Sequence, residues 1–109
     1  MWVVPPYGEE ELAELIGWVM FAAPVSRADL DSQISVLQSG NLNLASLREA
    51  LAATKECMND QGLDVRWEDA DGLGGWGAPE SDYESALRCS GVNSLLLVTA
   101  WREHKQQKE

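Results

Sequence analysis

The stretch SRADLDSQISVLQSGNLNLASLREAL, residues 26–51, predicts two helices joined by a short connector. Ser26 and Asp29 have the spacing of a capping box, in which each side chain caps the other residue's backbone N–H at a helix start. Ser39-Gly40 should end this helix, because glycine is favoured just after a helix. Since few residues join the two helices, we expect them to pack antiparallel.

The second helix of this pair should run over residues 44–60. Asn43 is a suitable cap for its first turn, and Gly62 is a suitable residue just after its end. Its apolar residues recur at helical spacing, so one face should be buried. These residues are Leu44, Leu47, Leu51 and Met58.

A further helix is predicted upstream, over residues 9–22, and Pro24 should end it. Apolar residues fall at i, i+3, i+4, i+7 and i+8 in this segment. Trp18 and Phe21 lie outside that stripe and widen the apolar face, so this helix could be buried on two sides. The stripe consists of Leu12, Leu15, Ile16, Val19 and Met20.

The pattern changes after the third helix. Residues 63–67 alternate between apolar and polar, which predicts a short strand or an extended arm with Trp67 pointing inward. Residues 68–80 hold four of the nine glycines and read as a loop.

Two more helices are predicted towards the C-terminus. Ser81 and Glu84 repeat the capping-box spacing, and Gly91 should end the helix that they open. Asn93 can cap the last helix. The continuous apolar run within residues 92–101 would also suit a buried strand, although its length and polar continuation favour helix.

The fold class is therefore all-α: a single domain, residues 1–109, forming a small bundle of four to five helices with one acidic, glycine-rich loop. The formal net charge is −10, from 18 acidic and 8 basic residues. Acidic residues are densest in residues 61–84, where seven acids stand against one arginine. Such a chain repels phosphate, which excludes direct binding to nucleic acid or to anionic membranes and favours a basic protein surface as partner.

Location and redox state are predicted from the chain start and the cysteines. The start, MWVVPPYGEE, lacks the features of a signal peptide, and no stretch approaches the ~20 apolar residues of a membrane span. We therefore expect a cytoplasmic protein in which Cys57 and Cys89 are reduced and act as small apolar fillers. With His104 as the single histidine, expected at the surface, a zinc site lacks ligands.

The stretch WEDADGLGGWGAPESDYE, residues 67–84, partly matches a calcium loop. Asp69, Asp71 and Glu80 stand at positions 1, 3 and 12 of that pattern. Leu73 at position 5 offers no oxygen, and Pro79 at position 11 would interrupt the exiting helix. We therefore predict an acidic surface loop, with no metal and no cofactor.

The same stretch supplies the candidate partner-binding site. Trp76 could be an exposed anchor among carboxylates, because tryptophan is enriched in interface hot spots. Alternatively, Trp76 folds back as a lid on the helical core. The candidate site consists of Asp64, Glu68, Asp69, Asp71, Trp76, Glu80 and Asp82.

No nucleophile elbow, P-loop or dinucleotide-binding motif occurs, so we predict a protein that is not an enzyme. In size and charge the chain resembles the small acidic inhibitors that phages and mobile elements direct at nucleic-acid-binding defence machinery. That resemblance implies an inhibitor that docks on a basic surface. The alternative is a helical assembly or scaffold subunit, such as a phage morphogenesis factor, with Trp18, Phe21 and residues 95–101 in subunit contacts.

Overall fold

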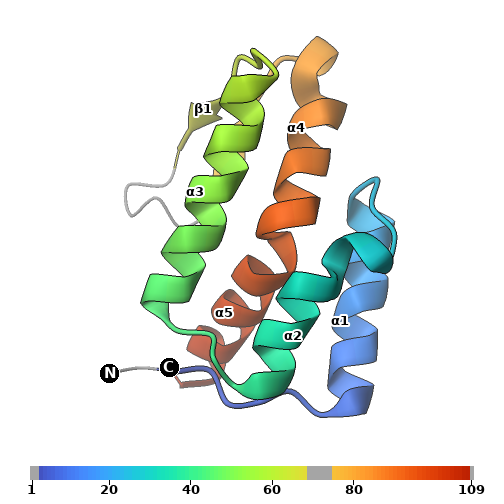
Figure 1. Cartoon of the computed structure of the whole chain (residues 1–109), viewed down its shortest axis with the longest axis vertical. Coiled ribbons are helices and arrows are strands. Elements are labelled where there is room, and N and C mark those ends of the chain that lie inside the picture. Colours follow the sequence, from blue (N-terminus) through green and yellow to red (C-terminus); the bar gives the residue numbers. More distant parts are fainter. Residues whose placement is uncertain (1–2, 69–74, 109) are drawn as a thin grey trace.

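The computed structural model describes residues 3–68 and 75–108, with side chains as far as His104, and it confirms the all-α prediction. Helices pack side by side, and a two-stranded antiparallel sheet projects beside α3 (Figure 1). The elements are α1 (Glu9–Ala22), a 3₁₀ turn η1 (Ala28–Leu30), α2 (Asp31–Ser39), α3 (Leu44–Asp60), β1 (Arg66–Trp67), β2 (Trp76–Gly77), α4 (Glu80–Asn93) and α5 (Leu95–Lys108).

The main core surrounds α5, which packs against α1, α2, α3 and α4. The apolar run that could have been a strand is therefore helical. The residues of this run are buried because neighbouring helices cover α5 on several sides. A helix that is covered on several sides needs no polar face, so the run lacks an amphipathic pattern. The buried residues of α5 are Leu96, Leu97, Val98, Ala100 and Trp101.

Several helix ends follow the sequence prediction. Ser26 and Asp29 form the reciprocal bonds of a capping box, with the Ser26 N–H donating to Asp29 Oδ2 at 2.9 Å, although they precede the 3₁₀ turn η1 and α2 begins only at Asp31. Asn43 caps α3 by accepting from the Ser46 N–H at 2.9 Å. Gly40 and Gly62 follow helices with φ of 73° and 67°, in the left-handed region where glycine is least strained.

The predicted packing of the second helix on the third is wrong, because α3 packs mainly against α4, whereas α2 packs against α5. The predicted second capping box is also wrong. Helix α4 begins at Glu80, directly after Pro79, and has no side-chain cap. Proline is well suited to precede a helix because it has no N–H to satisfy and its φ is already compatible.

Gly91 does not end α4, which continues to Asn93. A Cβ atom at Gly91 would lie 2.7 Å from Val25 Cγ1, so glycine is needed here for close packing rather than for a turn. Asn93 does not cap α5 either. Its side chain donates to the Cys89 carbonyl at 2.9 Å, within its own helix.

The α4–α5 junction is capped instead by Gln33, a buried side chain of α2 that the sequence analysis did not single out. Its Nε2 donates to the carbonyls of Gly91 and Val92, both at 2.9 Å. Its Oε1 accepts from the N–H groups of Leu96 and Leu97 at 3.0 and 3.3 Å. One amide thus satisfies the end of one helix and the start of the next, where backbone groups have no partner within the helix.

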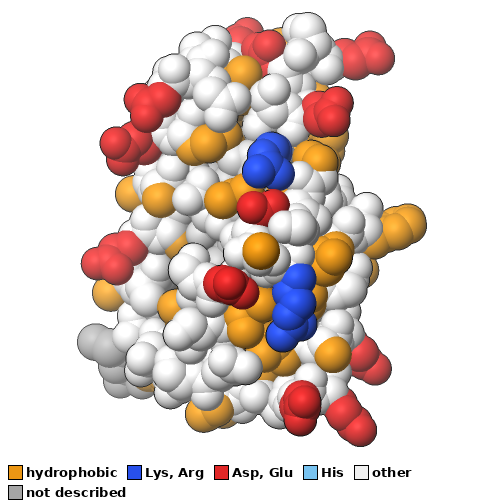
Figure 2. All heavy atoms as spheres, turned by 45° about the vertical axis from the view of Figure 1, so that its right-hand side comes forward, with side chains coloured by type: hydrophobic (Ala, Val, Ile, Leu, Met, Phe, Trp, Pro, Cys, Tyr) orange, Lys and Arg blue, Asp and Glu red, His pale blue; other side chains and the backbone are white. Residues whose placement is uncertain are grey.

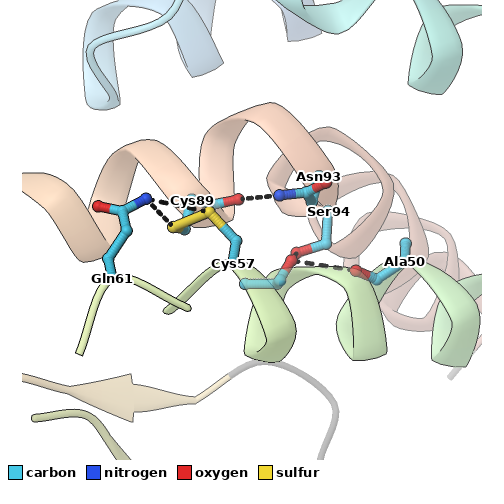
Figure 3. The surroundings of a disulfide bond; sticks show 7 residues. Ala50, Cys57, Gln61, Cys89, Asn93 and Ser94 are labelled. Atoms are coloured by element: carbon cyan, nitrogen blue, oxygen red, sulfur yellow. Dashed lines mark hydrogen bonds between the residues drawn. A yellow bond between two sulfur atoms is a disulfide. The ribbon is translucent and has the colours of Figure 1, made fainter. Parts of the chain in front are cut away.

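Cys57 and Cys89 form a disulfide between α3 and α4, which corrects the prediction of two reduced thiols (Figure 3). Antiparallel packing of these helices brings the two Cα atoms to 5.8 Å, within the range that a disulfide needs. The two cysteines are 32 residues apart in the sequence, so no local pattern predicts that they meet. Gln61 donates to both sulfur atoms, at 3.4 and 3.2 Å.

Candidate protein-binding surface

Helix α1 exposes large apolar side chains although one of its faces is fully buried. Trp18, Met20 and Phe21 are 52%, 41% and 91% exposed. The prediction that α1 is buried on two sides is therefore wrong, because Trp18 is half-exposed and Phe21 is almost fully exposed. Residues three apart are neighbours on a helix surface, so these two side chains form one outward patch.

A groove of about 320 Å³ lies beside Trp18, between α1 and α5. We call it the acidic groove, because three of its lining side chains are carboxylates. Its apolar lining comes from Trp18 and the edge of Leu15. The lining residues are Glu11, Glu14, Leu15, Trp18, Thr99 and Glu103.

A smaller hollow of about 90 Å³, here the tryptophan hollow, adjoins the acidic groove and shares Trp18 and Thr99 with it. The strand pairing places Trp67 opposite Trp76, which brings both indoles to the same side of the hairpin. The hollow lies between the hairpin, α1 and α5. It is lined by Trp18, Leu51, Trp67, Trp76, Ser90, Ser94, Leu95, Val98, Thr99 and Arg102.

Trp76, the anchor considered from sequence, lies partly buried against the helices. Its ring centroid is 5.4 Å from that of Tyr83, and it packs on Met58, Ala86 and Cys89. Of the two interpretations, the structure matches a side chain folded onto the core. Trp67 is also partly buried, with Lys55 Nζ 4.8 Å from its ring centroid.

Among the described acidic residues of the predicted site, one pair is in contact. Asp64, Glu68 and Glu80 are exposed, whereas Asp82 is partly buried and accepts a hydrogen bond from the Asp64 N–H at 3.0 Å. Asp69 and Asp71 lie outside the described residues. Within the described part of the chain, no three His, Cys, Asp or Glu side chains gather into a possible metal site.

Glu11 and Glu103 also influence Tyr7, near the other end of the acidic groove. Partial burial, together with the nearby charges of Glu103 and then Glu11, raises the pKa of Tyr7 to about 12. His104 was expected at the surface but is partly buried, and it lines a small cleft with Tyr7 and Glu103. Two carboxylates thus disfavour any further negative charge in this region.

Negative charge is spread over the surface rather than confined to the hairpin. On the face in Figure 2, acidic side chains lie mainly around the rim, with hydrophobic side chains between them. The acidic groove could not be predicted from the sequence, because its residues come from two helices far apart in the chain. One sequence feature did point to this surface: Trp18 and Phe21 are large apolar residues of α1 that lie outside its stripe of core-facing residues.

Comparisons with protein families, with curated proteins and with solved structures give no match to this chain. Among the described helices, none combines the length and apolar character that crossing a membrane requires.

Proposed function

We propose that this chain is a small acidic protein-binding protein that docks on a basic surface of a partner. The observation that carries the proposal is the pairing of exposed aromatics with carboxylates on α1. Phe21 is 91% exposed, and burying such a side chain in a complex would contribute roughly 1.5–3 kcal/mol. The surrounding negative charge would steer a basic partner and exclude acidic ones.

The apolar anchor in this proposal is the Trp18–Phe21 patch. Trp76 contributes to the tryptophan hollow from its partly buried position. The exposed carboxylates of Asp64, Glu68 and Glu80 extend the negative surface on the hairpin side and stay part of the predicted site.

In its more specific form, the proposal is an inhibitor of the phage or mobile-element type. The partner's basic groove would normally hold nucleic acid, and carboxylates would stand where phosphates otherwise lie. The net charge of −10 supports this form, because a groove built for a polyanion attracts such a chain.

A cytoplasmic location remains part of the proposal, but the disulfide places a condition on it. Cytosolic thiol systems keep most cysteines reduced. The Cys57–Cys89 bond therefore favours action in an oxidising compartment, or protection of the bond by burial, since Cys89 is 1% exposed.

A second candidate, a helical assembly subunit, is favoured by the same exposed α1 patch. Copies of the chain could bury Phe21 against one another. The α5 run proposed for subunit contacts is buried within the monomer, so α1 would have to supply the contact. The mass in solution separates the two functions, because an obligate oligomer favours the assembly subunit.

The test is affinity capture at low salt with the wild type and with Phe21→Ser. We expect at least one captured protein to be lost from the variant. The purified partner should then bind Phe21→Ser at least about tenfold more weakly, which is typical of an anchor residue. Gln38→Ala, an exposed change on α2, is the control and should bind like the wild type.

Raising the salt concentration should weaken the same complex steeply, because screening removes the attraction between exposed charges. An affinity unchanged by salt would contradict the electrostatic part of the proposal. An affinity unchanged by Phe21→Ser would contradict the anchor.

A further inference from the structure

We infer that the acidic groove receives a lysine or arginine side chain of the partner, and that the tryptophan hollow receives an adjacent small apolar side chain. The inference rests on the proposed function and specifies the partner: an exposed segment in which a basic residue neighbours a small apolar one, such as alanine or valine.

The lining of the acidic groove suits a cation on a long aliphatic stem. Glu11 and Glu14 come from successive turns of α1, and Glu103 faces them from α5. Trp18 forms an aromatic wall of the groove, and the face of its ring attracts a cation. The stem would cover the apolar surface of Trp18 while the charged end meets the carboxylates.

The groove is large enough for a lysine or arginine side chain. Its volume of about 320 Å³ lies at the lower end of the range of about 300–1,000 Å³ for ligand pockets. A folded domain cannot enter such a space, but one extended residue of a partner can.

The carboxylates determine which hollow takes the cation. Glu11, Glu14 and Glu103 line the acidic groove, whereas no carboxylate is among the lining residues of the tryptophan hollow. A cation is therefore attracted to the acidic groove. The tryptophan hollow is mostly apolar and holds about 90 Å³, which suits a small apolar group.

The two hollows are neighbours, because Trp18 and Thr99 line both. Neighbouring side chains of one partner segment can therefore reach both at once. This arrangement distinguishes the inference from general attraction between an acidic protein and a basic one, because it requires binding centred on Trp18.

The probe is a short peptide of alternating lysine and alanine, titrated into the ¹⁵N-labelled full chain and followed by NMR. The chain has five tryptophans, and Trp18→Phe identifies the indole N–H signal of Trp18. We expect this signal and the backbone amide signals of Glu14 and Thr99 to shift with a saturable curve. A peptide of alternating glutamate and alanine should leave them in place.

Matched charge variants separate a site from a diffuse field. Glu14→Gln with Glu103→Gln removes two carboxylates from the groove and should weaken the peptide roughly three- to tenfold. Glu49→Gln with Glu56→Gln removes two exposed carboxylates from α3 and should leave the affinity unchanged. Equal weakening by both pairs, or peptide binding that does not move the Trp18 signal, would overturn the inference.

Failure of the inference is distinguishable from failure of the proposed function. If partner capture depends on Phe21 but the peptide does not bind at Trp18, the groove is wrong and the docking patch stands. If the peptide binds at Trp18 but Phe21→Ser captures and binds every partner normally, the α1 anchor is wrong and the cation groove stands.

Discussion

The two hydrophobic clusters of this domain are stabilised in different ways. The main core is built mostly from residues of α1, α2, α3 and α5, and the disulfide does not cross it. The second cluster lies between α3, α4 and the hairpin, where Met58, Ala86 and Cys89 are fully buried within a rim of partly buried residues. A cluster this small buries little apolar area, and the disulfide lies within it.

The comparison matters for the binding surface because the tryptophan hollow lies where the two clusters meet. Trp67 packs against both of them, whereas Trp76 packs against the second. Trp18 of α1 is half-exposed and lines the hollow together with them. One wall of the hollow thus depends on the main core and another on the disulfide-linked cluster.

The largest expected effect comes from Gln33, the buried amide between α2 and the α4–α5 junction. Gln33→Ala would leave two carbonyls and two N–H groups without a partner in the interior, each costing about 1–3 kcal/mol. We expect unfolding in urea to show a loss of about 3 kcal/mol or more, accompanied by faster hydrogen exchange in α5.

Gln38→Ala on the exposed side of the same helix is the control and should change stability by less than about 0.5 kcal/mol. If Gln33→Ala lowers the free energy of unfolding no more than the control does, water replaces the amide in the variant. The hydrogen bonds of Gln33 would then not stabilise the main core.

Removal of the disulfide should have the next largest effect. Cys57→Ser with Cys89→Ser should lower the free energy of unfolding by ~2–4 kcal/mol, because the unfolded chain loses its cross-link. We expect hydrogen exchange to rise most at the Glu68 N–H, which bonds to the Gly75 carbonyl at 2.9 Å beside the strands.

Exchange at the Val98 N–H in α5, which bonds to the Ser94 carbonyl at 2.8 Å, is the internal reference. An equal rise at Glu68 and Val98 would show that the disulfide stabilises the whole domain rather than the second cluster. The distinction between the two clusters would then be wrong.

Local features of the fold could be predicted from the sequence, whereas contacts between distant segments could not. The bounds of α1 and α3, the Asn43 cap and the glycines after α2 and α3 depend on neighbouring residues, so their patterns are visible in the chain. The Cys57–Cys89 bond and the bonds of Gln33 join residues 32 or more positions apart. No local pattern indicates which distant partner such a residue will meet.

The candidate site divides in the same way. The sequence identified Trp76 and its acidic neighbours because tryptophan between glycines is unusual, but it could not show the indole packed against Tyr83. The acidic groove is formed by residues of α1 and α5, including Glu14 and Glu103, and it exists because these helices pack together. From the sequence, Trp18 could be either a buried residue of α1 or a subunit contact. The choice depends on which element covers that face, and the sequence does not show this.

The smallest expected effect is the loss of stability at alkaline pH that Tyr7 causes, at the end of the main core where this side chain packs. The folded pKa of Tyr7, about 12, lies above the usual value of 10, so the fold favours the neutral phenol. This contribution to stability is fully present below pH 10 and is lost as the pH rises from about 10 towards 12, because the unfolded chain ionises first. With Tyr7 partly exposed, the loss should be about 1 kcal/mol or less.

Urea unfolding of the wild type and Tyr7→Phe at about pH 8 and pH 11 measures this contribution. We expect the wild type to lose more stability than the variant over this interval, since phenylalanine cannot ionise. Glu103→Gln should reduce the wild-type loss, because the Glu103 charge contributes to the raised pKa. An equal pH dependence for wild type and Tyr7→Phe would show that the phenol is solvated in the folded protein. Alkaline weakening would then have to come from elsewhere in the domain, the second cluster included.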